Sequence, residues 1–249
     1  MVCSSGVGFD PVVDGDRLLF ELTGVYNAVM VMSDRKTDTV WSHLTGEGLH
    51  GAHKGRQLAY VPTYTVTWKE WKRRHPRTKV LSLDPRYEKF YAPSGLGRKA
   101  LGAGRAADGK TLSKGFRRSL AGPFDDRLKP NALVLGVAAG GASKAYPLEA
   151  LGSDPLEDEL GGTPILILAG GGGAMAFDRR LHGTTLTFDG RTDRETGTRW
   201  DDEGRGIKGK LKGEALRPVF AIVTEWYGWS LYRPDTALHE AETSPNSDD

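Results

Sequence analysis

One pattern of acidic turns, tryptophans and glycines occurs twice in this chain of 249 residues and includes all six of its tryptophans. The first copy reads DRKTDTVW over residues 34–41, and the second reads DRETGTRW over residues 193–200. A glycine-punctuated stretch follows each one, at residues 46–58 and 204–216. Only one residue of length change interrupts the register. The chain is therefore predicted to contain an internal duplication.

Each copy closes on a short helical segment that carries two tryptophans three residues apart. Residues 67–74 begin with a threonine that can cap a helix, and they stop before a His-Pro pair. The counterpart, residues 224–232, stops before an Arg-Pro pair. Residues three apart share one face of a helix. Both pairs are therefore predicted to press into the core: Trp68 with Trp71, and Trp226 with Trp229.

Glycine is the outlier of the composition, with 33 residues. Glycine supplies the positive φ of tight turns, so this abundance predicts many short strands. Runs of strand character include residues 17–22, 28–32 and 184–188. The predicted fold class is α+β and mainly β. It consists of two internal pseudo-repeats of short strands, each closed by a short helix, packed as one pseudo-symmetric unit.

Composition excludes several classes of function. A hydrophobic share of 38% with 27% charged residues is that of an ordered protein, and a net charge of +2 gives no argument for a nucleic-acid partner. No apolar run approaches the roughly 20 residues of a membrane span, and no signal peptide opens the chain. The single cysteine excludes an internal disulfide framework and leaves the cellular compartment open.

The pattern divides the chain into four segments. Residues 1–81 hold the first copy and residues 131–240 hold the second. Between them, residues 82–130 form a basic, glycine-rich connection, for which a solvated linker is favoured over a loop that meets an anionic partner. Residues 241–249 are predicted to be a disordered acidic tail.

The second copy has a leader, residues 133–168, that precedes its Phe-Asp pair at 177–178. The first copy has the same pair at residues 9–10, almost at Met1. One hypothesis is an N-terminal truncation, whose lost part could have carried a signal peptide. The alternative is that the missing strands are dispensable or come from another chain. Exposed sheet edges would then favour self-association.

Landmarks spread over essentially the whole chain point to one family: Trp41-Ser42, Leu44-Thr45-Gly46, Gly51, Gly55, Thr67-Trp68 with Trp71, His75-Pro76, Thr78, Leu135-Gly136-Val137, Lys144 to Leu148 and Gly161-Gly162. In this order they resemble the bacterial and archaeal proteins called domain of unknown function 3179. Members of that family usually carry a Cys-Pro-Leu-Cys-like element before the Phe-Asp pair. Cys3 fits its second cysteine, and the first would fall before Met1. The resemblance implies a fold and a kinship but no particular reaction.

The two copies differ in residues that could bind a metal ion. The first copy carries three candidate ligands where the second does not: Cys3, His43 and His75, against Gly171, Asp202 and Arg233. Thiolate and imidazole suit zinc, copper or iron. The resemblance weakens His43, because the family usually has glutamine there. His75 also has a structural interpretation, as a cap at a helix end.

Three hypotheses of function follow. The first is a non-catalytic binding module for a metal, cofactor or redox partner, centred on the first copy, with a transition metal as the candidate cofactor. The second is an enzyme of unrecognised class with a cleft between the copies. The third is a structural or interaction domain. The glycine run at residues 170–173 lacks the lysine of a phosphate-binding loop, and no hydrolase or zinc-protease motif occurs.

Overall fold

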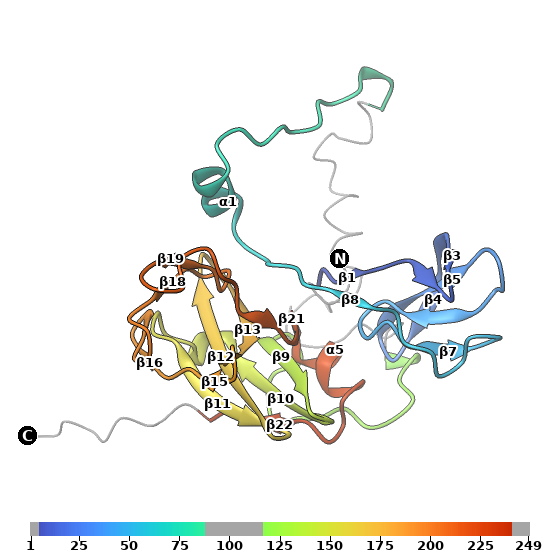
Figure 1. Ribbon diagram of the computed structural model, residues 1–249. Helices are drawn as coiled ribbons and strands as arrows, with labels where there is room; N and C mark the ends of the chain where they lie inside the picture. The colour runs from blue at the N-terminus through green and yellow to red at the C-terminus, as the bar shows by residue number, and fades with distance from the viewer. Residues whose placement is uncertain (1–4, 88–116, 241–249) are drawn as a thin grey trace, which may run out of the picture. The chain divides into compact units, whose positions relative to one another are not determined.

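The computed structural model describes residues 5–87 and 117–240 (Figure 1). Cys3, much of the predicted 82–130 connection and the predicted tail lie outside these residues. The chain divides into two compact units. Unit 1 comprises residues 1–132 with 224–234, and unit 2 comprises the rest.

The described residues are mainly β, as predicted, and their sheets are mostly antiparallel. β10 (Ala142–Pro147) and β22 (Ala237–Leu238) form a short parallel pair. Two α-helices are found in the described part of the chain, α1 (Trp68–Arg74) and α5 (Trp226–Ser230), together with the 3₁₀ turns η1 (Pro85–Tyr87) and η2 (Leu148–Ala150). No helix in this part of the chain is long and apolar enough to cross a membrane.

Unit 1 is built on one four-stranded sheet, in the order β4 (Phe20–Tyr26), β5 (Val29–Asp34), β6 (Val40–Ser42), β7 (Gly48–His50). Two smaller sheets pair β1 (Gly8–Phe9) with β8 (Tyr60–Val61), and β2 (Val12–Val13) with β3 (Asp16–Arg17). Leu18, Trp41 and Leu58 form one of its buried clusters. Trp41 and Leu58 belong to the repeated sequence pattern, so the pattern contributes to the core of this unit.

The β4–β5 hairpin of unit 1 is anchored at its tip. Asn27 and Ala28 turn the chain with positive φ. The Asn27 amide N–H donates to the Ser119 carbonyl at 2.9 Å, and its side chain donates to the Leu231 carbonyl at 3.4 Å. The tip is thus tied both to the segment around Ser119 and to the residue that follows α5.

Unit 2 carries its apolar residues in longer strands. Its first sheet has the order β21 (Phe220–Glu225), β9 (Leu133–Ala139), β10, β22, and its second has the order β11 (Leu156–Leu160), β12 (Thr163–Gly170), β13 (Gly173–Asp178), β20 (Arg217–Pro218). Strand alternation puts Ile165 and Ile167 in one core cluster and Leu166 and Leu168 in another. The run at 165–168 is therefore a strand buried on both faces.

The rest of unit 2 contains the second copy of the tryptophan turn. A four-stranded sheet has the order β16 (Phe188–Asp189), β17 (Thr192–Asp193), β18 (Arg199–Trp200), β19 (Gly206–Lys208), and β14 (Arg180–Leu181) pairs with β15 (Thr184–Thr185). The Asp193 carboxylate accepts from the Trp200 indole N–H at 2.9 Å. In unit 1 the Asp34 carboxylate accepts from the Trp41 indole at 3.0 Å. Both turns thus share one local geometry.

The helices differ between the two sequence copies. In α5 the side chains of Trp226 and Trp229 are buried, as predicted. In α1 the side chains of Trp68 and Trp71 are 56% and 38% exposed, and none of its residues is buried. The prediction that both pairs press into the core is therefore wrong for α1. Spacing shows that a helix has an apolar face but does not supply the partner that covers it.

Candidate functional site

His43 stands on a fixed turn of unit 1, directly after β6. The carbonyl of the preceding residue, Ser42, accepts from the Gly46 amide at 2.8 Å, and its hydroxyl accepts from the Thr45 amide at 3.1 Å. Ser42 and Thr45 are both buried. The turn therefore holds the backbone of His43 in one place, while its side chain is half-buried.

The hydrogen bonds of the His43 ring define its tautomer. Nδ1 lies 2.6 Å from the Met30 carbonyl oxygen, which can only accept, so Nδ1 carries the proton. In a neutral ring Nε2 then holds the lone pair. Nε2 lies 3.3 Å from the Ser5 hydroxyl, which can donate to it. A backbone carbonyl that accepts from one ring nitrogen is the usual arrangement around a histidine whose other nitrogen binds a metal ion.

The other two candidate ligands are placed differently. Cys3 lies outside the described residues, but Ser5, two positions later in sequence, contacts His43. His75 is the C-cap of α1: its backbone N–H donates to the Trp71 carbonyl at 2.8 Å, and its ring stacks on Trp71 with 4.1 Å between centroids. Within the described residues, no three His, Cys, Asp or Glu side chains form a group that could hold a metal ion.

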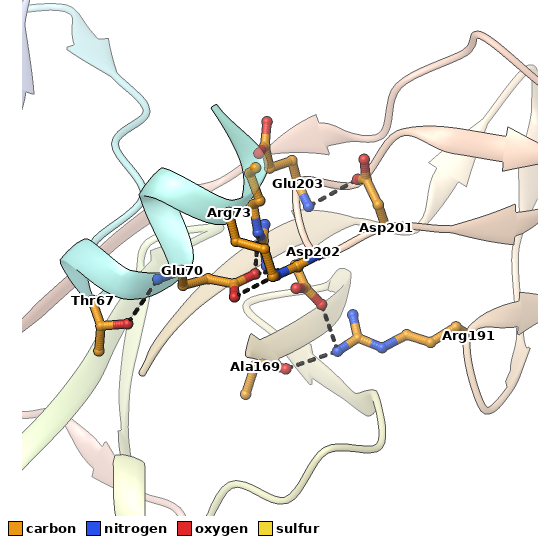
Figure 2. A network of polar contacts seen from close by, with 9 residues as sticks. Thr67, Glu70, Arg73, Ala169, Arg191, Asp201, Asp202 and Glu203 are labelled. Carbon is orange, nitrogen blue, oxygen red and sulfur yellow. Dashed lines mark hydrogen bonds and ion pairs between the residues drawn. The ribbon is translucent and has the colours of Figure 1, made fainter. Parts of the chain in front are cut away.

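In unit 2 the position that matches His43 holds an ion pair. Figure 2 shows the Arg191 guanidinium beside the Asp202 carboxylate, at 2.8 Å, and beside the Ala169 carbonyl, at 2.7 Å. A Cβ on Gly170 would lie 2.8 Å from the Asp202 carboxylate, so this carboxylate packs directly on the end of β12. The counterpart of the histidine site is thus occupied by charges that neutralise each other.

A cavity of about 330 Å³ lies in unit 2 at the turn between β12 and β13. Leu148, Leu151 and Ser153 line it together with the glycine run. Gly171 and Gly172 both have positive φ and form the tip of this hairpin, with Gly170 paired to Gly173. The glycines therefore serve a tight strand-to-strand turn, which agrees with the absence of a phosphate-binding motif.

The polar residues of α1 in Figure 2 are explained by the helix itself. The Thr67 hydroxyl caps the helix by accepting from the Glu70 amide at 3.3 Å. The Glu70 carboxylate accepts from the Arg73 guanidinium at 2.9 Å and also pairs with Arg74. Hydrogen bonds from Arg73 and then Arg74 lower the pKa of Glu70 to about 2. These contacts stabilise the helix and do not define a site.

One polar cluster in unit 2 was missed in the sequence. The Asp158 carboxylate accepts from the Lys144 ammonium at 2.6 Å and from the Tyr146 hydroxyl at 2.8 Å. Burial, followed by the hydrogen bond to Asp158, raises the pKa of Tyr146 above its usual value. Strand alternation places Lys144 and Tyr146 on one face, but nothing in the sequence indicates that Asp158, which is on another strand, meets them. The phenol stays protonated, so we assign this cluster to the fold.

These features define a class: a mainly β protein of two compact units, with a histidine held on a fixed turn of unit 1. The family described as "Protein of unknown function (DUF3179)" matches residues 1–236, so the chain belongs to this family. The resemblance inferred from the landmark residues is thereby confirmed. No curated protein and no solved structure matches the chain.

Proposed function

We propose that this protein is a binding module for a transition-metal ion, or for a metal-linked cofactor or redox partner, with its site in residues 1–81. The observation that carries the proposal is the His43 ring. Its Nδ1 is held by the Met30 carbonyl at 2.6 Å, and its Nε2 faces the segment that begins with Ser5. Cys3 and His75 remain the other candidate ligands.

The chemistry of the candidate residues supports a thiophilic metal. A cysteine thiolate together with a neutral imidazole is a donor set that suits zinc, copper or iron. The backbone carbonyl on Nδ1 fixes the ring and increases the basicity of Nε2. Ser5 lies beside His43, and Cys3 precedes Ser5 by two positions in the sequence.

The unequal polar residues of the two sequence copies also support a site in the first one. We propose that residues 1–81 and 131–240 are two copies of one module, which the matched Asp-Trp hydrogen bonds favour. At the position of His43 the second copy has Asp202, which is neutralised by Arg191. One copy would then keep the site while the other acts as scaffold.

Metal content and calorimetric titration test this proposal. The purified full chain is analysed for bound metal and then, after chelation, titrated with Zn²⁺ and Cu²⁺. We expect one ion per chain and at least a tenfold weaker affinity in His43→Ala and in Cys3→Ser. His75→Ala tests the third ligand separately. His182→Ala, which removes an exposed histidine of unit 2, is the matched control.

Two results would overturn the metal site. One is a wild-type chain that binds no ion in either titration. The other is a His43→Ala protein that is folded and binds as tightly as the wild type. An interaction role is the second candidate function, and the exposed tryptophans of α1 favour it.

A further inference from the structure

Exposed apolar side chains are concentrated in one segment of unit 1, residues 61–83. Thirteen large hydrophobic residues in the described part of the chain are exposed, and six of them lie in this segment: Val61, Trp68, Trp71, Val80, Leu81 and Leu83. Leu81 is 91% exposed and Val80 is 71% exposed. So much apolar surface over so short a stretch marks a site that binds a partner.

The matching segment in the second sequence copy is covered. When Trp68 is aligned with Trp226, residues 62–67 align with β21, and residues 79–80 align with β22. In the structure β21 and β22 do not pair with each other. The β9–β10 hairpin lies between them, in the order β21-β9-β10-β22. The two aligned segments of unit 1 form no strand.

Residues 62–67 nevertheless have the pattern of a strand. Thr63, Thr65 and Thr67 are exposed and alternate with Tyr64 and Val66, which are half-buried. β-Branched and aromatic residues in strict alternation are typical of a strand with one covered face. This segment thus has the side chains of a sheet strand, and residues 79–80 match the other outer strand.

We propose that residues 61–83 are a docking surface for an apolar β-hairpin of another polypeptide, which inserts two strands between residues 62–67 and residues 79–80. Two strands are needed because two strands, β9 and β10, lie between the outer strands β21 and β22 in the unit 2 sheet. Addition of strands gives affinity through main-chain hydrogen bonds and selectivity through alternate side chains. The proposal rests on the duplication and not on the metal site.

The hairpin that fits is described by β9 and β10. The inner strands of the unit 2 sheet bury Leu135 and Val137 of β9, and Ala145 and Tyr146 of β10. All but Ala145 belong to the cluster in which Ala221 and Val223 of β21 also pack. A partner of this chemistry would cover Val61 and Val80, and it would order residues 62–67 as a strand.

A peptide of residues 131–150 is the probe, and it is added to the full chain. We expect protection of the amides of residues 63–67 and 79–81 in hydrogen–deuterium exchange, with a blue shift of tryptophan fluorescence. The control peptide carries Leu135→Asp and Val137→Asp and should do neither. The same hairpin joined to the N-terminus of the chain by a flexible linker raises its effective concentration and removes the dependence on weak binding.

Variants of the chain complete the test. The double variant Trp68→Ser, Val80→Ser should weaken peptide binding at least tenfold, whereas Ile207→Ser, an exposed apolar residue of unit 2, should not. The proposal is overturned if the linked hairpin leaves the amides of residues 63–67 unprotected. It is also overturned if those amides become protected with rising concentration of the chain alone, because the occupant would then be a second copy.

Discussion

At the scale of single residues, the two buried aspartates explain the spacing of the tryptophan turn. Asp34 and Asp193 are almost completely buried, and each receives a threonine hydroxyl and a tryptophan indole N–H. Burial alone would raise the pKa of Asp34, but the hydrogen bonds from Trp41 and Thr37 outweigh it, and the pKa is lowered. The acidic residue, the threonine and the tryptophan are thus one structural motif.

Removing one of these carboxylates should be costly. Asp193→Ala leaves the buried Trp200 indole N–H without its acceptor, and each buried donor left unpaired costs about 1–3 kcal/mol. We expect the free energy of unfolding, measured with urea, to fall by at least this amount. Asp189→Ala is the control, since its side chain is 79% exposed. Equal stability of the two variants would contradict the motif.

Gly204, in the stretch that follows Trp200, has an aromatic ring packed directly against it. A Cβ on Gly204, where φ is +71°, would lie 2.6 Å from the ring of Phe177. Gly190 also has positive φ but has open space around it. We expect Gly204→Ala to lower the melting temperature clearly more than Gly190→Ala does, because only the first adds a steric clash to backbone strain. Calorimetry measures both melting temperatures. A larger decrease for Gly190→Ala than for Gly204→Ala would show that the Phe177 ring does not pack against Gly204.

At the scale of elements, α1 depends on charge more than on burial. The folded-state pKa of Glu70 is about 2, below the ordinary value of 4.5. Its stabilising contribution is therefore complete above pH 4.5 and is lost as the pH falls toward 2. We expect the protection factors of the α1 amides, which are corrected for the intrinsic pH dependence of exchange, to fall over this range. Glu70→Gln should remove the pH dependence, and an unchanged profile would show that the ion pairs contribute nothing.

The two helices also show what sequence reasoning can and cannot reach. The tryptophan spacing correctly predicted both helices, but it could not predict which one is covered. In α5 the Trp226 indole donates to the Asp125 carbonyl, and the Arg127 guanidinium lies over its ring. These contacts come from residues outside the repeated pattern. Burial of a short helix depends on such distant segments, which local periodicity does not encode.

At the scale of the whole molecule, the mainly β class and the family were predictable because short-range signals carry them. The sequence predicted neither the full length of the β4–β5 hairpin, from Phe20 to Asp34, nor the hydrogen bond that ties its tip to the residue after α5. Nor did it predict the Lys144-Asp158-Tyr146 cluster, because Asp158 reaches it from another strand. For the candidate site, the composition of the first copy pointed to His43, but only the structure gave the orientation of its ring.

The metal site that we propose depends on the Met30 carbonyl, which holds the His43 ring through Nδ1 so that Nε2 is the metal-binding nitrogen. A long-range ¹H–¹⁵N correlation spectrum of the full chain tests it, with the ring signals assigned by their loss in His43→Gln. We predict a neutral ring with its proton on Nδ1, and a change of the Nε2 shift when Zn²⁺ is added. A ring protonated on Nε2, or an Nε2 signal that zinc leaves unchanged, would show that His43 does not bind a metal ion in this way.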